Sequence, residues 1–209
     1  MASGSPRSSW SFPVQRAVRR HVESAEVPAV QYYVAQSLDG YIAELDGGIE
    51  WLTGFDSATE IGASEATDGS YDEFYAGVGA MAMGSATYEF ILGLGAWPYG
   101  ETPAWVFSSR DLASIEDADV RFARGPVGPV HADMIAAAGE RNVWIVGGGG
   151  LAVQFADEGL LGELRLTIVP VVLGSGIPAF DGRLRSQLAL AGTQVFSNGM
   201  VELRYGVAR

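Results

Sequence analysis

The run of four glycines at residues 147–150 constrains the fold of this chain more than any other feature. The residues before it include β-branched Val143, Ile145 and Val146, and they predict a short buried strand. Residues 151–155 after it have a spacing typical of a helix. A strand that passes through glycines into a helix N-terminus presents bare N–H groups and a positive dipole end, which favours a phosphate or a dinucleotide. The alternative is a tight turn without a ligand, because the run is not a GxGxxG fingerprint and no acidic residue follows at the expected offset.

The composition bounds the class of protein. With 209 residues, 48% of them hydrophobic and 18% charged, the chain suits a single globular domain with a sizeable core. The net charge of −12 argues against nucleic acid as a partner, because nucleic-acid binding requires clustered cations. All 13 basic residues are arginine, which excludes a Schiff-base lysine and a Walker-type phosphate lysine.

The scarcity of cysteine and histidine narrows the chemistry further. The chain has no cysteine, so disulfides, thiol nucleophiles and iron–sulfur clusters are excluded. His21 and His131 are its only histidines, and no metal site is expected. No apolar run approaches the roughly 18 residues of a membrane span. We therefore expect a cytoplasmic protein that acts on a small molecule and has no membrane partner.

Residues 1–28 differ from the rest of the chain. They are rich in serine and contain a small cluster of arginines, without the apolar segment of a secretory signal. We interpret them as a flexible N-terminal extension, with a transit peptide as the alternative. Residues 29–209 form the predicted domain.

Strands and helices alternate through most of this domain. The predicted strands are residues 30–34, 80–83, 105–107, 120–123, 143–146 and 164–173; the predicted helices are residues 71–78, 129–140 and the segments after Gly84 and Gly150, with Ser85 or Thr87 available as an N-cap. Residues 53–68 are expected to form a long loop. Two final strands, at 188–196 and 201–207, form a hairpin at Asn198-Gly199. This order predicts an α/β, three-layer fold with a mainly parallel central sheet, helices on both faces and an antiparallel C-terminal hairpin.

Three glycine-rich or polar loops begin where predicted strands end, at residues 84–87, 108–110 and 147–150. In open parallel sheets, ligands bind beyond the carboxyl ends of the strands, so these loops could face one crevice. The loop at 108–110 offers two hydroxyls and a guanidinium, which suit a phosphate, although alone it would be an ordinary loop. The pair Asp39-Gly40 predicts a further turn after the first strand.

In its motifs the chain resembles the dihydrofolate-reductase-like superfamily, most closely the reductase domain of riboflavin-pathway deaminase-reductases and its stand-alone relatives. The resemblance covers residues 30–207 and is carried by segments 35–43, 51–53, 83–89, 106–109, 146–151 and 170–176. It implies a reductase that uses NADPH, with NADH as a further possibility, and it implies a homodimer. The apolar residues 164–173 and the β-rich tail are the expected interface.

The resemblance also implies roles for individual residues. On the cofactor, the pyrophosphate and adenosine side would be bound by Gly84, Ser85 and Thr87, and the ribose 2′-phosphate by Ser108, Ser109 and Arg110. The pyrophosphate would also be bound by the glycine run and the residues that flank it: Val146, Gly147, Gly148, Gly149, Gly150 and Leu151. The nicotinamide half would be bound by Asp39, Gly40 and Trp51. Asp39 and Tyr33 are the catalytic candidates. Asp39 could orient the loop over the nicotinamide or simply form its turn, and Tyr33 could donate a proton or pack in the core.

Three residues depart from the pattern of the relatives. Many relatives have arginine where this chain has Ser85, and that arginine helps to select NADPH. The riboflavin-pathway reductases have a substrate-binding glutamate at the position of Val146 and a lysine at the position of Tyr33. The expected function is transfer of a hydride from NADPH to a small heterocyclic or carbonyl-type substrate. The alternatives are a catalytically inert nucleotide-binding sensor or scaffold, and a true dihydrofolate reductase.

Overall fold

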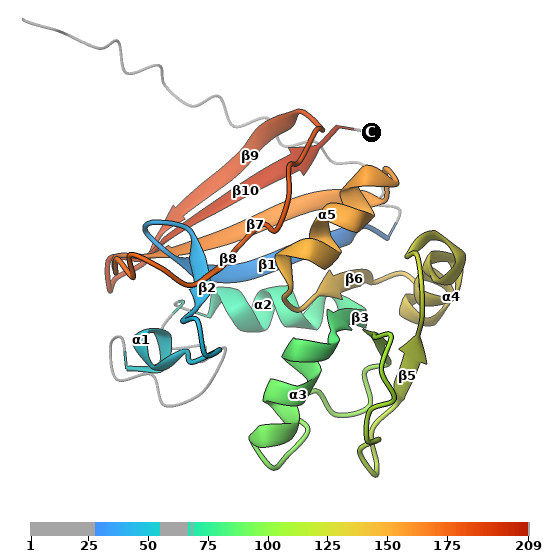
Figure 1. The fold of residues 1–209 in the computed structure, drawn as a ribbon. Coiled ribbons are helices and arrows are strands. Elements are labelled where there is room, and N and C mark those ends of the chain that lie inside the picture. The colour runs from blue at the N-terminus through green and yellow to red at the C-terminus, as the bar shows by residue number, and fades with distance from the viewer. Residues whose placement is uncertain (1–27, 55–66, 68, 209) are drawn as a thin grey trace, which may run out of the picture.

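The structure is a computed structural model that describes residues 28–54, 67 and 69–208 (Figure 1). The predicted extension at residues 1–28, apart from its last residue, lies outside the described residues. So does most of the loop predicted at residues 53–68. No helix in the described ranges has the length and apolar character needed to cross a bilayer.

A single large sheet organises the described part of the chain. Its order is β5-β4-β3-β6-β1-β7-β10-β9. The strands are β1 (Val30–Ser37), β3 (Val78–Gly84), β4 (Ala104–Phe107), β5 (Val120–Ala123), β6 (Asn142–Ile145), β7 (Leu161–Val169), β9 (Leu188–Val195) and β10 (Val201–Val207). The first six in this order run parallel to one another, whereas β10 is antiparallel to both of its neighbours, β7 and β9. The predicted mainly parallel sheet with an antiparallel C-terminal hairpin is confirmed.

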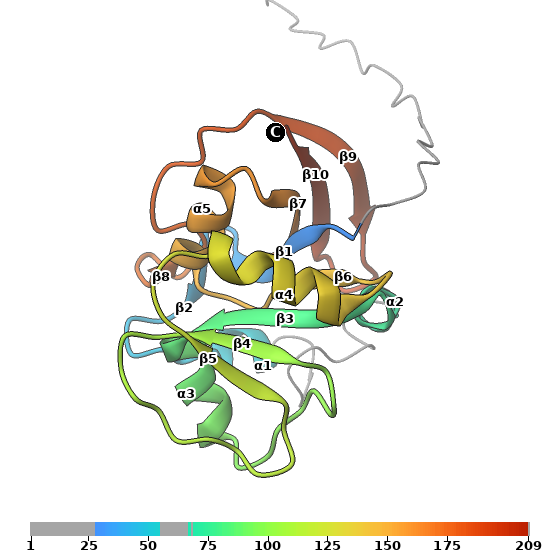
Figure 2. The same cartoon turned by 90° about the vertical axis from the view of Figure 1, so that its right-hand side faces the viewer.

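Helices cover both faces of this sheet. The helices α4 (Gly128–Ala138) and α5 (Gly149–Asp157) pack on one face, where Met134 and Phe155 share a core with Tyr32 of β1. Figure 2 shows α4 lying across β3 and β6. The helices α2 (Ser70–Ala76) and α3 (Ser85–Gly93) pack on the other face. There, Phe74 and Tyr88 join a second, aromatic-rich core. The three-layer prediction is therefore confirmed.

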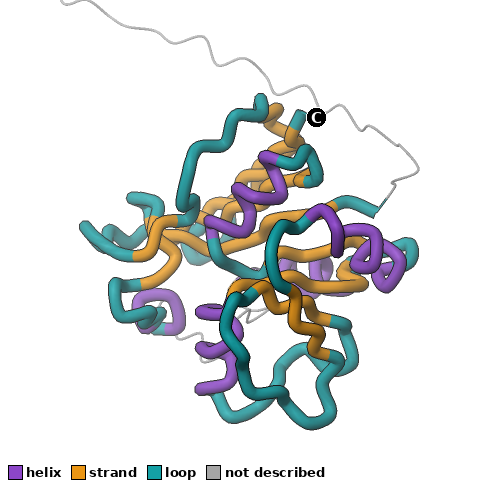
Figure 3. Tube along the Cα trace, turned by 45° about the vertical axis from the view of Figure 1, so that its right-hand side comes forward, coloured by secondary structure: helices purple, strands orange, loops and turns teal. Residues whose placement is uncertain are grey.

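Smaller elements decorate the carboxyl edge of the sheet. The turn at Asp39 leads from β1 into β2 (Tyr41–Ala43), which pairs with β8 (Ile177–Pro178) in a separate antiparallel ribbon. The short helix α1 (Glu50–Thr53) follows β2. The C-terminal hairpin turns at Asn198 and Gly199, as predicted, with Gly199 at φ +91°. Figure 3 shows in teal the loops that join the strands to these elements.

Several predicted boundaries were wrong. The strand predicted at 164–173 begins earlier and ends at Val169, because Pro170 cannot donate to a ladder. The helix predicted at 71–78 ends at Ala76, and Val78 opens the buried strand β3 instead. Helix α5 begins at Gly149, within the glycine run rather than after it. Neither Ser85 nor Thr87 caps α3, since its N-cap is Gly84 and no side chain caps it.

Candidate cofactor site

Two helix N-termini meet at the carboxyl edge of the sheet. Strands β3 and β6 are neighbours, and each leads directly through glycine into a helix, α3 or α5. Because α3 and α5 pack on opposite faces of the sheet, their N-termini flank a topological switch point, which is where open α/β sheets bind ligands. The N-caps, Gly84 and Gly148, provide no side-chain hydrogen bond to the first N–H groups. These N–H groups and the two positive dipole ends are suited to binding the phosphates of a dinucleotide.

The glycines at these helix N-termini differ in why the backbone requires or permits glycine. Gly148 lies at φ +86°, in the left-handed region that glycine adopts without strain. A Cβ on Gly149 would lie 2.4 Å from the carbonyl oxygen of Ala179, so this position must stay bare for the loop after β8 to pack. A Cβ on Gly84, in contrast, would meet no atom within 4 Å. The tight-turn interpretation thus explains part of the run, and the open space at Gly84 leaves room for a ligand.

The first and third predicted loops come together. A Cβ placed on Gly147 would lie 3.2 Å from the Oγ1 of Thr87, so the first turn of α3 lies against the glycine run. Val146 continues the ladder beyond β6, with its N–H donating to the carbonyl of Ala82, and its side chain packs on the aromatic core. Leu151 is buried in the first turn of α5. The residues in this region fit a bound diphosphate.

The second loop follows the neighbouring strand β4, and two of its polar side chains, Ser108 and Arg110, already form hydrogen bonds. The hydroxyl of Ser108 donates to the carbonyl of Arg110 and accepts from the Arg110 N–H. The guanidinium of Arg110 donates to both carboxylate oxygens of Glu89 on α3, at 3.0 and 2.6 Å. These hydrogen bonds and the charge of Glu89 raise the pKa of Arg110. Ser109 is exposed at the same turn.

Asp39 joins two loops at the same edge of the sheet. Its carboxylate accepts hydrogen bonds from the Ser37 hydroxyl at 2.7 Å and from the N–H groups of Leu173 and Gly174, at 3.1 and 2.7 Å. The hydroxyl hydrogen bond, followed by those from the backbone, holds the pKa of Asp39 below its ordinary value. An ionised carboxylate with these partners suits an anchor for the loop after β1 better than a proton donor. Gly40, at φ +90°, completes the turn.

Trp51 lies on α1, where it packs against a small buried cluster of Val169, Phe196 and Met200. Its indole Nε1 is buried and has no hydrogen-bond partner in the described part of the chain. An open pocket of about 380 Å³ adjoins the Asp39 anchor and is lined by Glu44, Leu45, Asp46, Leu173 and Ser175. The nicotinamide roles of Asp39, Gly40 and Trp51 stay predictions.

Tyr33 lies in the core between β1 and α2, one residue beyond the point where Tyr32 pairs with Ile145 of β6. Its ring stands edge-on to Phe74 at 4.5 Å, and its hydroxyl accepts a hydrogen bond from Thr167 at 3.4 Å. Burial raises the pKa of its phenol. This environment matches the alternative in which Tyr33 is a packed core residue.

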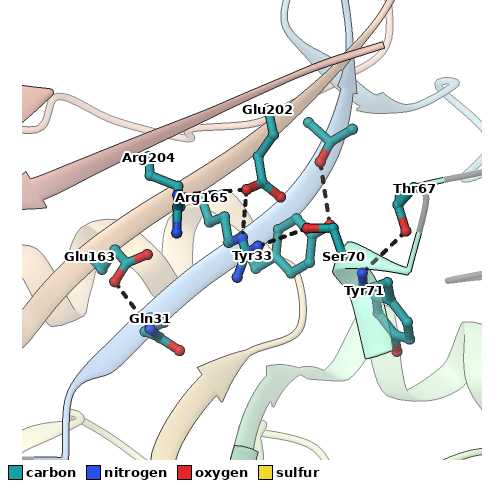
Figure 4. A network of polar contacts seen from close by, with 10 residues as sticks. Gln31, Tyr33, Thr67, Ser70, Tyr71, Glu163, Arg165, Glu202 and Arg204 are labelled. Atoms are coloured by element: carbon teal, nitrogen blue, oxygen red, sulfur yellow. Dashed lines mark hydrogen bonds and ion pairs between the residues drawn. The ribbon is translucent and has the colours of Figure 1, made fainter. Parts of the chain in front are cut away.

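A buried ion cluster beside Tyr33 was missed by sequence reasoning (Figure 4). Glu202 on β10 lies 2.9 Å from the Nε of Arg165 on β7 and 3.8 Å from the Nε of Arg204. A further N–H of Arg165 donates to the Ser70 hydroxyl on α2. The alternation of polar residues along β7 and β10 was the signal for it. A pocket of about 260 Å³ beside the cluster is lined by Gln31, Glu73, Phe74, Gly77, Asn142, Arg165, Gln194 and Arg204.

The described residues contain no group of three or more His, Cys, Asp or Glu side chains placed to hold a metal ion.

The structure places the three predicted phosphate loops along neighbouring strands, in the order β4, β3, β6, with the Asp39 turn at the next strand, β1. Tyr33 belongs to the aromatic core against which Val146, just before the glycine run, packs.

Comparison with known proteins shows relatives over most of the chain. The uncharacterized protein YwjB of Bacillus subtilis is 35% identical over 175 residues, covering 83% of this chain and 94% of that protein. The crystal structure of a putative riboflavin biosynthesis protein from Shewanella is 27% identical, with a TM-score of 0.71, and the match covers 87% of this chain and 99% of that one. A dihydrofolate reductase from Enterococcus faecalis, complexed with NADP(H), has a TM-score of 0.56 at 17% identity, covering 87% of this chain and 97% of that one.

The last of these likenesses concerns the fold, because its sequence identity is low. The family model of the RibD C-terminal domain matches residues 98–202, which include β4, the glycine run and β7. The chain therefore belongs to the RibD C-terminal domain family, and its fold is dihydrofolate-reductase-like.

Proposed function

We propose that this protein is a reductase that binds a nicotinamide dinucleotide, NADPH by first expectation, and reduces a small heterocyclic or carbonyl-type substrate. The observation that carries the proposal is the pair of uncapped helix N-termini at adjacent strands β3 and β6, on opposite faces of the sheet. A dinucleotide diphosphate is the ligand that such a switch point favours. The Enterococcus faecalis enzyme of the same fold was solved with NADP(H), which supports a cofactor of this chemistry.

In this proposal the residues of the chain bind and orient. The N–H groups that follow Gly84 and Gly148 would hold the diphosphate between the two helices, and Thr87 would lie beside it, where the first turn of α3 meets the glycine run. Asp39 would fix the loop after β1 against the loop after β7. When bound, the reduced nicotinamide supplies the hydride, and the protein sets its position against the substrate.

The residues next to the glycine run favour a planar substrate. Val146 packs on a cluster that contains Tyr33, Phe74 and Trp144. In this cluster the Trp144 ring makes four edge-on contacts with the phenylalanine and tyrosines around it. The glutamate and lysine of the riboflavin-pathway relatives are replaced here by Val146 and Tyr33. A heterocycle without a strongly charged side group fits such surroundings better than a charged sugar derivative.

A second candidate is a nucleotide-binding module without catalysis. Both catalytic candidates are engaged internally: Asp39 by three hydrogen bonds and Tyr33 by burial in the aromatic core. The two functions differ in turnover. A catalyst would oxidise NADPH in the presence of a panel of heterocyclic and carbonyl substrates, whereas the module would bind the cofactor tightly and leave its absorbance unchanged.

The test uses one position at which charge alone is varied. A side chain at Gly84 meets no atom within 4 Å, and the residue has φ −82°, so both Gly84→Asp and Gly84→Asn should fold. Both residues are good N-caps and should preserve or raise the melting temperature. Only the aspartate places a negative charge where the diphosphate is proposed to bind.

Binding of NADPH and NADH is measured by quenching of tryptophan fluorescence and by calorimetry. We expect Gly84→Asp to weaken binding of both cofactors at least about tenfold relative to Gly84→Asn, as expected for like charges at short range. Equal affinities of the two variants would show that the diphosphate does not bind beside residue 84. Absence of binding by the unmodified protein would refute the proposed function.

A further inference from the structure

The guanidinium that is proposed to recognise a 2′-phosphate is held by a carboxylate of the same chain. Arg110 lies three residues after β4, and Glu89 lies on α3, which begins directly after the neighbouring strand β3. Two parallel hydrogen bonds, at 3.0 and 2.6 Å, join the Arg110 fork to both oxygens of Glu89. This bidentate geometry is the one that arginine uses for phosphate, so a phosphate and Glu89 compete for the same donors.

The loop after the neighbouring strand β5 also has an arginine paired with a carboxylate. Arg124 immediately follows β5, and its guanidinium lies 2.5 Å from a carboxylate oxygen of Asp111. The two arginines that follow β4 and β5 therefore each have an acidic partner at the carboxyl edge of the sheet. The side chains of Arg110 and Glu89 are 57% and 43% exposed, so their ion pair is accessible to a ligand.

The chemistry at the ribose 2′ position discriminates between two cofactors. A 2′-phosphate is accommodated by arginine, whereas a free 2′-hydroxyl tolerates or prefers a carboxylate. With Glu89 in place, an incoming phosphate dianion must displace a carboxylate and remain near its negative charge. A 2′-hydroxyl meets neither obstacle. Ser85, at the position where many relatives have arginine, adds no compensating cation.

We infer that Glu89 is a specificity-determining residue, which holds Arg110 and thereby lowers the preference for the 2′-phosphorylated cofactor. The inference rests on the proposed function, because it requires the adenosine end of a dinucleotide to lie at the loop after β4. Removal of the carboxylate should free Arg110 for the phosphate without changing the rest of the site.

The experiment is a calorimetric titration of Glu89→Gln with NADPH and NADH, and with adenosine 2′,5′-bisphosphate and ADP as fragments that lack nicotinamide. We expect NADPH and adenosine 2′,5′-bisphosphate to bind about tenfold more tightly than to the unmodified protein, and NADH and ADP to change by less than about twofold. The gain should shrink as salt is raised, because the pair is exposed.

The matched control is Asp119→Asn. Asp119 forms an exposed bidentate pair with Arg121, at 2.9 and 2.8 Å, but it precedes β5 and so lies at the opposite edge of the sheet. The control removes the same charge and should leave all four affinities unchanged. An equal gain in this variant would show a general charge effect and overturn the inference.

The double variant Glu89→Gln with Arg110→Gln completes the test, and it should lose the gain in NADPH affinity. An unchanged ratio of NADPH to NADH affinity in Glu89→Gln refutes the role of Glu89 but leaves the proposed function standing. If neither cofactor binds to any of these variants or to the unmodified protein, the proposed function itself fails.

Discussion

Replacement of Glu202 by glutamine should destabilise this fold more than any exposed charge change. The Glu202 side chain is 1% exposed, and its Oε1 lies 2.9 Å from the Nε of Arg165 and 3.8 Å from that of Arg204. Figure 4 shows this cluster on the face of β7 and β10 that also carries Tyr33 of β1. Glutamine has nearly the shape of glutamate, but it is neutral and has an NH2 donor in place of one acceptor oxygen.

The loss of stability in Glu202→Gln depends on the arginines that remain in the cluster. Arg165 is 11% exposed, and its other described polar partner is the neutral Ser70 hydroxyl, so its charge would stay buried without a counter-charge. Breaking a buried pair in this way costs about 3–5 kcal/mol. Arg204 is 44% exposed and can regain water, which favours the lower end, about 3 kcal/mol. For a chain of this size that corresponds to a fall in melting temperature of about 6–12 °C.

The assay is urea unfolding followed by circular dichroism, with Glu89→Gln as the control. The control breaks an exposed pair that solvent screens, so it should leave the urea midpoint almost unchanged. A double variant, Arg165→Met with Glu202→Leu, removes both buried charges and should be more stable than Glu202→Gln alone. The reasoning would be refuted by a loss below about 1 kcal/mol in Glu202→Gln, or by a double variant less stable than the single one.

Three further predictions concern other parts of the fold. Asp39→Asn should lower the melting temperature at neutral pH, because the folded pKa of Asp39 lies below its unfolded value of about 4. The stabilisation by the ionised Asp39 is complete above pH about 4 and is lost as the pH falls through the folded pKa, so the melting temperatures of the two proteins should converge in acid. Gly149→Ala should cost about 1–3 kcal/mol in urea unfolding, since its Cβ would meet a backbone carbonyl at 2.4 Å, whereas Gly150→Ala should be neutral or stabilising because its nearest neighbour lies at 3.7 Å. The proposed homodimer is best placed at the edge strand β9, where Leu190 and Val195 are 60% and 74% exposed, so lysine at both positions should convert a dimer to a monomer in analytical ultracentrifugation; a species of unchanged mass would exclude this edge.

The part of the fold that could be predicted from the sequence is the part encoded by local patterns. The strand and helix on either side of the glycine run, the strand at Val120 and the turn at Gly199 each carry their signal within a few residues. Strand ends then identified the loops at the carboxyl edge, because parallel strands place those ends together. The observed order of β4, β3 and β6 agrees with that expectation.

The parts that could not be predicted depend on residues distant in sequence. Asp39 finds its backbone partners at Leu173 and Gly174, more than 130 positions later, and no local pattern records that pairing. Glu89 and Arg110 are 21 positions apart and meet only because β3 and β4 are neighbours. The dimer interface predicted at residues 164–173 and the β-rich tail stays a prediction. The place of β7 between β1 and β10, with Arg165 in the buried ion cluster, has no local signal in the sequence.

The measurement that tests the central claim most directly is a crystal structure of the protein grown with NADPH. We predict that the diphosphate lies between the N-termini of α3 and α5, within hydrogen-bond distance of N–H groups that follow Gly84 and Gly148, with the adenosine end toward Arg110. A cofactor bound elsewhere, or no cofactor between these helix N-termini at saturating NADPH, would contradict the account.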